Sequence, residues 1–178
     1  ISPEVRASAQ VAAGNQNHFP SIRGVGADFV EIRSWPVELG QNFSESDVRN
    51  ANKVAVIGKT ASDTLFGDSD PIGQIIRIKS APFTIVGLLK KKGMSMMGED
   101  QDDVILVPYS SAMKRLTGDT TFRSLNVQAA EASQMADVQN QVTELLRQRH
   151  KIGPDKEDDF IVRTQQEISE AATETSRV

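Results

Sequence analysis

The sequence predicts an α+β fold with two lobes: a discontinuous βα sandwich lobe and an inserted, mainly β lobe with short helices. Three observations support this class. Residues 4–13 alternate between apolar and polar side chains, residues 53–93 combine strand, helix and turn patterns, and a long amphipathic helix begins near residue 133. A chain of 178 residues, 38% apolar and 25% charged, is long enough to bury a core.

The N-terminal residues are predicted to form a β-hairpin. The alternation over residues 4–13 is typical of a half-buried strand. Residues 14–17, Gly-Asn-Gln-Asn, tolerate the backbone angles of a tight turn, so residues 18–25 are expected to return antiparallel. Asp28 then caps a short helix, which ends before Trp35 because a proline follows it.

Residues 53–93 are predicted to form a compact β-α-β-β element. A short apolar run over 54–57 indicates a buried strand. Thr60 is expected to be the N-cap of the helix, with Asp63 completing a capping-box pattern. The remaining predicted boundaries are a helix end at Gly67 and strands over residues 74–79 and 82–89.

Residues 90–103 have a different composition, with a basic triplet, two glycines, three methionines and an acidic cluster. They cannot build a core, and we expect an exposed, mobile loop. Residues 104–107 then predict a buried strand that ends at Pro108. Ser110 is expected to cap a helix that runs through Leu116.

The C-terminal third begins with a strand that alternates over residues 123–129. Ser133 is expected to open the longest helix, whose apolar stripe packs on a sheet. Residues 160–162 predict a short closing strand. Thr164 and Glu167 form a full capping box for a last helix.

The lobes are assigned from these elements. The outer segments, residues 1–25 and 122–165, both supply alternating strands, and only the later one supplies a long helix, so we expect them to cover one sheet together. Residues 26–121 form the inserted lobe. Residues 166–178 are the start of the last helix.

Composition excludes several classes of protein. A formal charge of −4 gives no basic footprint for nucleic acid, and the absence of cysteine removes disulfides and thiolate sites. No apolar run reaches the length of a membrane span. The chain starts at Ile1 and stops within a helical pattern, so we expect both ends to be cuts in a longer protein whose flanking segments hold the membrane spans.

No residue is predicted to be catalytic, and no cofactor or metal site is predicted. Residues 58–60, Gly-Lys-Thr, resemble the end of a phosphate-binding loop. That loop also needs a glycine five positions before Gly58, and this position is occupied by Lys53. His18 and His150 have no second ligand at metal spacing. The acidic residues before the buried strand favour solvated loop charge over a cation site; they are Glu99, Asp100, Asp102 and Asp103.

The candidate site residues are Met94, Met96 and Met97, between two glycines. Methionine is an adaptable apolar residue that suits surfaces meeting varied partners. The sequence therefore predicts a partner-contact or gate element here. The alternative is a loop folded back over its own lobe.

One stretch carries a family resemblance. It reads VAVIGKTASDTLFGDSDPIGQIIRIKSAPFTIVGLLKKKG and is followed by DQDDVILVPYSSAMKRLTG. The LFG, DPIG, F-x-I-V-G and DD-x-I-x-x-P elements, in this order, resemble the periplasmic core domain of MacB-type ABC transporter permeases, in the MacB/FtsX/LolC-like superfamily. The later SLNVQA, LLRQRH and DDFIVRTQQEI segments extend the likeness to nearly the whole chain.

The resemblance implies a porter-like lobe, over residues 1–25 and 122–165, and a sabre-like inserted lobe, over 26–121. The family domain begins with another strand and helix, so the porter-like lobe is expected to be incomplete before Ile1. Residues 166–178 are then expected to lead towards a transmembrane segment.

The function implied by the resemblance is a non-catalytic periplasmic domain of an inner-membrane permease. It would transmit ATP-driven conformational change and dock a periplasmic adaptor protein for efflux. The implied partners are a second permease copy in a homodimer, the adaptor, a TolC-like outer-membrane channel, and an ABC ATPase in a separate cytoplasmic domain or subunit. Alternatives are a lipoprotein-releasing or FtsX-like signalling permease and, from another class, a secreted binding module or small hydrolase.

Overall fold

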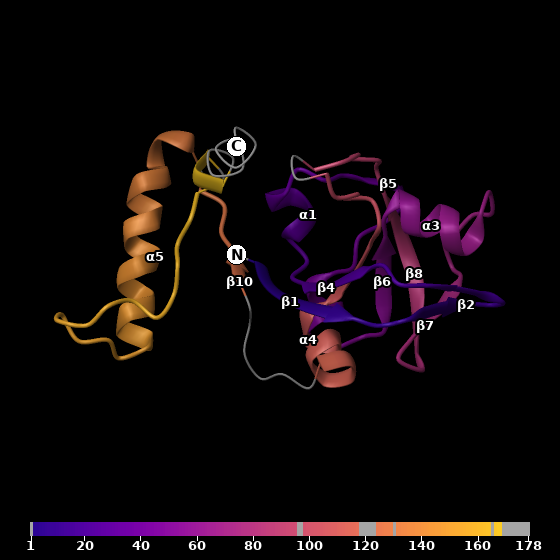
Figure 1. The fold of residues 1–178 in the computed structure, drawn as a ribbon, viewed down its shortest axis with the longest axis horizontal. Helices are drawn as coiled ribbons and strands as arrows, with labels where there is room; N and C mark the ends of the chain where they lie inside the picture. The colour runs from indigo at the N-terminus through magenta and orange to yellow at the C-terminus, as the bar shows by residue number, and fades with distance from the viewer. Residues whose placement is uncertain (1, 96–97, 118–123, 130, 165, 169–178) are drawn as a thin grey trace. The chain divides into compact units, whose positions relative to one another are not determined.

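The computed structural model describes residues 2–95, 98–117, 124–129, 131–164 and 166–168 (Figure 1). Contacts divide the chain into two compact units, residues 1–127 and 128–178. The first unit is a β-sheet with short helices. The second is a long helix with the segment that follows it.

Within the described residues, ten strands form one mixed sheet. They are β1 (Ser2–Ser8), β2 (Val11–Ala13), β3 (Gln16–His18), β4 (Ser21–Val25), β5 (Val37–Gly40), β6 (Val54–Ile57), β7 (Ile75–Ile78), β8 (Ala81–Leu89), β9 (Val104–Pro108) and β10 (Ser124–Asn126). Their order is β10-β1-β4-β9-β6-β8-β7-β2-β3, and β5 also pairs with β8. The β4–β9 and β6–β8 pairs are parallel and the others antiparallel.

The helices of the first unit are short. They are α1 (Phe29–Ile32), α2 (Glu45–Arg49), α3 (Lys59–Phe66) and α4 (Tyr109–Ala112), which continues as a π-helical turn, Met113–Thr117. A strand-rich mixed sheet with few short helices confirms the α+β class.

The N-terminal hairpin is confirmed, with a break in each arm. Ser8 pairs with Ser21 in the β1–β4 ladder, and Val11 pairs with His18 in the β2–β3 ladder. The turn uses Gly14 at a φ of 58°. Beyond the break, β2 pairs with β7 instead of continuing along β4, so one hairpin contributes to two parts of the sheet.

Apolar side chains are buried on both faces of the sheet. In β9, Ile105 packs in one cluster with Ala61 of α3, while its neighbour Leu106 packs in the other with Phe29 of α1. Strands buried on both faces are continuously apolar rather than alternating. The prediction of buried strands at β6 and β9 is therefore confirmed.

The capping role predicted for Thr60 is wrong. Gly58 occupies the N-cap position of α3 without a side-chain cap, and the Asp63 carboxylate lies 3.2 Å from the ammonium of the first helical residue. Backbone from a distant segment supplies the missing partner, because the Ala61 N–H donates to the Asp102 carbonyl at 3.4 Å. The predicted helix end at Gly67 is confirmed, with φ at 61°.

Ser110 does not cap its helix as the sequence predicts. It lies inside α4, which follows β9 directly, and its hydroxyl donates to the Val48 carbonyl. The adjacent Ser111 hydroxyl donates to the Asn52 carbonyl at 2.7 Å. Both hydroxyls therefore join α4 to the region of α2 rather than starting a helix.

The sheet joins segments that the sequence assigns to different lobes. β4 pairs with β9, and β2 pairs with β7, so residues 1–25 and 26–121 share one sheet. β10 in turn pairs with β1, with Ser2 opposite Asn126. The contacts place a boundary after Val127. The porter-like and sabre-like assignments stay a prediction.

The second unit contains a 3₁₀ turn (Ala132–Gln134), α5 (Met135–Arg149) and a helical turn over residues 166–168. No residue of α5 is buried. The Gln139 side chain donates to the Val162 carbonyl, and Arg147 donates to the Gly153 carbonyl at 2.9 Å. Within its unit, α5 thus contacts the segment that follows it, and its packing on a sheet stays a prediction.

The predicted closing strand at residues 160–162 is wrong. These residues have no strand pairing; the Val162 carbonyl is bonded to a side chain of α5, and the Phe160 ring meets His150 edge-on at 5.6 Å. The following capping box is confirmed, with Thr164 and Glu167 exchanging two bonds of 3.2 Å.

The path of the last helix towards a membrane falls on residues 169–178, which lie outside the described part of the chain. Among the residues that the structure does describe, no helix combines the length and apolarity needed to span a bilayer.

Replacing Gly58 by Ala is expected to lower the free energy of unfolding by about 1–3 kcal/mol through overpacking. A Cβ atom here would lie 2.2 Å from the backbone oxygen of Asp102, which cannot rotate away. Gly153→Ala is the control, because a Cβ there meets nothing within 4 Å. Urea unfolding measures both, and equal stability of Gly58→Ala and the unsubstituted chain would contradict this close packing.

A buried carboxylate lies where β10 meets β1. Glu4 is 5% exposed and accepts from the Asn126 amide at 3.1 Å, while the Nε atoms of Arg6 and Arg23 lie 3.4 and 3.8 Å away. Burial alone would raise its pKa. The Asn126 bond and the two arginines outweigh that effect and hold the pKa of Glu4 below its ordinary value of 4.5.

Because the pKa is lowered in the folded state, the ionised Glu4 stabilises the fold above pH 4.5, and this stabilisation is lost as the pH falls through the lower folded pKa. Glu4→Gln is expected to lose about 1–3 kcal/mol at pH 7 and to show a shallower loss of stability on acidification. Glu157→Gln, at an exposed position, is the control. Identical pH profiles for Glu4→Gln and the parent chain would refute this role.

Candidate functional site

The loop between β8 and β9, residues 90–103, contains the predicted contact or gate residues. Met94 is 64% exposed. Met96 and Met97 lie outside the described residues. The contact role of all three stays a prediction, and the structure places one of them at the surface.

The first arm of the loop is anchored to the end of α1. The Trp35 indole N–H donates to the Lys90 carbonyl at 2.8 Å, and the Lys90 N–H donates to the Pro36 carbonyl at 2.9 Å. The Lys92 ammonium lies 4.8 Å from the centroid of the Trp35 ring, within range of a cation–π contact. Trp35 itself is 5% exposed, so this anchor belongs to the core.

The second arm is fixed by Asp102. Its carboxylate accepts from the backbone N–H groups of Lys92 at 2.7 Å and Gly93 at 2.8 Å. The residue is 1% exposed. Bonds from two amides to an ionised carboxylate are charge-assisted and stronger than neutral ones. Asp102 therefore ties the two arms of the loop together.

The interpretation of the acidic cluster as solvated charge is wrong for Asp102 and incomplete for Asp103. Asp102 is buried because its carboxylate satisfies two backbone donors. Asp103 lies 2.6 Å from His18 Nε2, which joins β3 to the start of β9. Glu99 and Asp100 are exposed at the tip, as the sequence predicts.

The tip of the loop is a small hairpin-like structure. Met94 and Asp100 form an isolated β-bridge, and the Gln101 N–H donates to the Gly93 carbonyl at 3.1 Å. Gly93 and Gly98 adopt φ of 91° and 80°, which explains the two glycines that frame the methionines. The loop is exposed at its tip as expected, while its arms are bonded to each other and to Trp35.

The other candidate chemistry is dispersed. The pairs His18–Asp103 and His150–Asp159 belong to different units, and no cluster of metal-ligating side chains occurs among the described residues. The loop anchors were missed by sequence reasoning. The sequence feature that points to these anchors is a single tryptophan directly before a proline, and by itself it predicts only a helix end.

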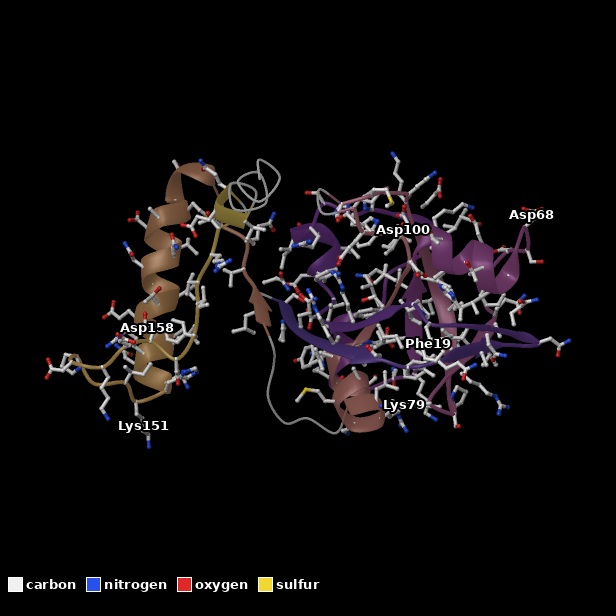
Figure 2. All side chains as sticks on the ribbon, in the orientation of Figure 1. Phe19, Asp68, Lys79, Asp100, Lys151 and Asp158 are labelled. Atoms are coloured by element: carbon white, nitrogen blue, oxygen red, sulfur yellow. The ribbon has the colours of Figure 1, made fainter. Side chains whose placement is uncertain are left out.

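Asp102→Asn is expected to lower the free energy of unfolding by about 1–3 kcal/mol, because one of the two backbone N–H donors loses its partner and the buried side chain loses an acceptor. The amides of Lys92 and Gly93 should exchange with solvent faster, which NMR hydrogen exchange resolves residue by residue. Asp68→Asn, in the exposed turn after α3 (Figure 2), is the matched control. Unchanged exchange at both amides would show that Asp102 does not hold the loop.

Comparison with known proteins agrees with this fold. The family model of the MacB-like periplasmic core domain matches residues 1–145. The chain is 43% identical, over 145 residues, to the macrolide export ATP-binding/permease protein MacB of Syntrophobacter fumaroxidans, covering 81% of this chain and 20% of that protein. It is 41% identical, over 151 residues, to the pyoverdine export ATP-binding/permease protein PvdT of Pseudomonas fluorescens, covering 84% of this chain and 23% of that protein.

Solved structures share the fold. The crystal structure of the periplasmic region of MacB from Actinobacillus actinomycetemcomitans has a TM-score of 0.75 at 20% identity, covering 97% of this chain and 74% of that one. The extracellular domain of the ABC-type transporter YknZ from Gram-positive bacteria has a TM-score of 0.72 at 19% identity, covering 84% and 75%.

The chain spans 20% and 23% of the length of the two relatives described above, so the activity of those whole proteins is not that of this domain alone. The family itself is shown by the match over residues 1–145. The chain belongs to the MacB-like periplasmic core domain family.

Proposed function

We propose that this chain is the periplasmic domain of a MacB-like ABC transporter permease, without catalytic activity of its own, which transmits ATP-driven conformational change and docks a periplasmic adaptor protein during export. The observation that carries the proposal is the family match over residues 1–145. The relatives are named as export ATP-binding/permease proteins, so the ATPase belongs to a separate cytoplasmic part of the parent protein or complex.

The arrangement of the first unit suits transmission of motion. The chain enters the sheet at β1 and leaves it at β10, and these strands are paired, with Ser2 opposite Asn126. A displacement applied at this edge acts on a sheet whose central strands are packed on both faces. Closely packed interiors move as rigid bodies rather than deforming gradually, so the displacement reaches the far edge.

The remaining partners follow from the same proposal. Two copies of the parent permease form a homodimer in the inner membrane, held by flanking spans. The adaptor leads to a TolC-like outer-membrane channel. The exposed tip of the loop at residues 90–103, with Met94 at its surface, is the proposed contact or gate element.

The test uses the parent transporter expressed with a periplasmic adaptor protein from the same organism. The adaptor is expected to co-purify with the parent transporter, and export of a transported compound should require the parent protein. Two results together would overturn the proposal in favour of a lipoprotein-releasing permease. The purified protein would bring down no adaptor, and deletion of the parent gene would leave lipoproteins in the inner membrane.

Replacing Met94, Met96 and Met97 together by Ser in the parent protein is expected to weaken adaptor recovery and export by about tenfold, because three adaptable apolar side chains, among them the exposed Met94, are removed from the proposed contact. Thermal unfolding of the chain should not change. Met135→Ser, at an exposed position on α5, is the control. Undiminished export by the triple variant would mean that the loop only covers its own lobe.

A further inference from the structure

Basic side chains gather on the α1 side of the sheet, near the base of the loop at residues 90–103. Arg6 of β1 and Arg23 of β4 are directly opposite each other in the antiparallel ladder. Like charges in such a cross-strand pair destabilise a sheet. Arg33, which follows α1, and Lys92 of the loop add two further positive charges close enough to act on Arg23 or on each other.

Acidic groups offset part of this charge, because Glu4 raises the pKa of Arg23 and Asp102 raises the pKa of Lys92. Burial is the main cause that lowers the pKa of both Arg23 and Lys92, and the charge of Arg33 lowers both further. Asp102 faces Lys92, but its carboxylate is occupied by two backbone amides. Glu4 forms ion pairs with both Arg6 and Arg23. The Nε atom of Arg23 is buried without a hydrogen bond.

A carboxylate of the chain already faces this cluster. The exposed Glu99, at the tip of the loop, raises the pKa of Arg23 through its charge. Arginine binds carboxylates in a planar, two-pronged geometry, so a carboxylate of a partner could compete with Glu99 for Arg23.

An apolar hollow adjoins the cluster. It has a volume of about 380 Å³, is open to solvent, and is lined by Val30, Glu31, Ser34, Trp35 and Pro36. Trp35 belongs to both features, because Lys92 lies over its ring. The accessible lining of the hollow is mainly apolar although Glu31 contributes to it, so it could take one apolar side chain, with carboxylates on the side of Lys92 rather than of Glu31.

We propose that this region, the Trp35 surface, binds an acidic segment of a partner protein, with one apolar side chain in the hollow and flanking carboxylates on Arg23, Arg33 and Lys92. The chain as a whole carries a charge of −4, so an acidic segment is repelled elsewhere and oriented by this cluster. The inference goes beyond the proposed transport function, because it requires no particular adaptor and involves a surface other than the methionines.

The test uses the 178-residue chain and a synthetic peptide of Asp and Glu residues around one Leu. Trp35 is the single tryptophan of the chain, so its fluorescence reports occupancy of the surface directly. We expect a saturable change at low salt that weakens as salt is added. The double variant Arg33→Gln, Lys92→Gln should bind about tenfold more weakly. Lys114→Gln, Arg115→Gln removes the same charge from exposed positions and should bind as the parent does.

Two further measurements should change the affinity for the peptide in opposite directions. Glu99→Gln should tighten binding by about two- to fivefold, because it removes the competing carboxylate, whereas Glu157→Gln should not. Replacing the Leu of the peptide by Ser should weaken binding by about tenfold.

Any of three results would overturn the proposal: no saturable change up to about 1 mM peptide, equal losses in the two double variants, or equal binding of the Leu and Ser peptides. A fluorescence change with vesicles of anionic lipid but not with the peptide would equally overturn it and indicate a membrane-facing surface.

Discussion

The position of Asp102 is the constraint on which much of the first unit depends. Its carboxylate holds the backbone of Lys92 and Gly93, and its carbonyl accepts from Ala61 at the start of α3. The same carbonyl approaches Gly58 so closely that a side chain there has no room. One residue just before β9 therefore fixes both the loop and the start of α3, and a buried carboxylate is tolerated because its acceptor capacity is used.

The parts of the fold that the sequence predicts correctly are those decided by neighbouring residues. The apolar runs of β6 and β9, the turn at Gly14, the helix end at Gly67 and the capping box at Thr164 each follow from side-chain period or local backbone preference. The failures concern partners far along the chain. The N-terminus of α3 is satisfied by the backbone of Asp102, 41 residues beyond Ala61, instead of by a Thr60 cap. Residues 160–162 form no strand, because they meet α5 instead of another strand.

The candidate site divides in the same way. Glycines on both sides of three methionines indicate an exposed turn, and Met94 is indeed at the surface. Trp35 could not be connected to this loop from sequence, because 55 residues separate it from Lys90. The pairing of Arg6 with Arg23 is the part of this site that the sequence can predict. A hairpin centred on Gly14 and Asn15 places these two positions opposite each other.

The two roles proposed for this loop depend on each other. Association requires that contact residues lose little conformational freedom when a partner binds. Bonds at the base, from Trp35 and Asp102, restrict the two arms of the loop before any partner binds. The same bonds keep Lys92 over the Trp35 ring and Glu99 near Arg23. We therefore expect a change at the base of the loop to affect both Met94 and the Trp35 surface. Binding of a partner at one of these surfaces would then change the affinity of the other.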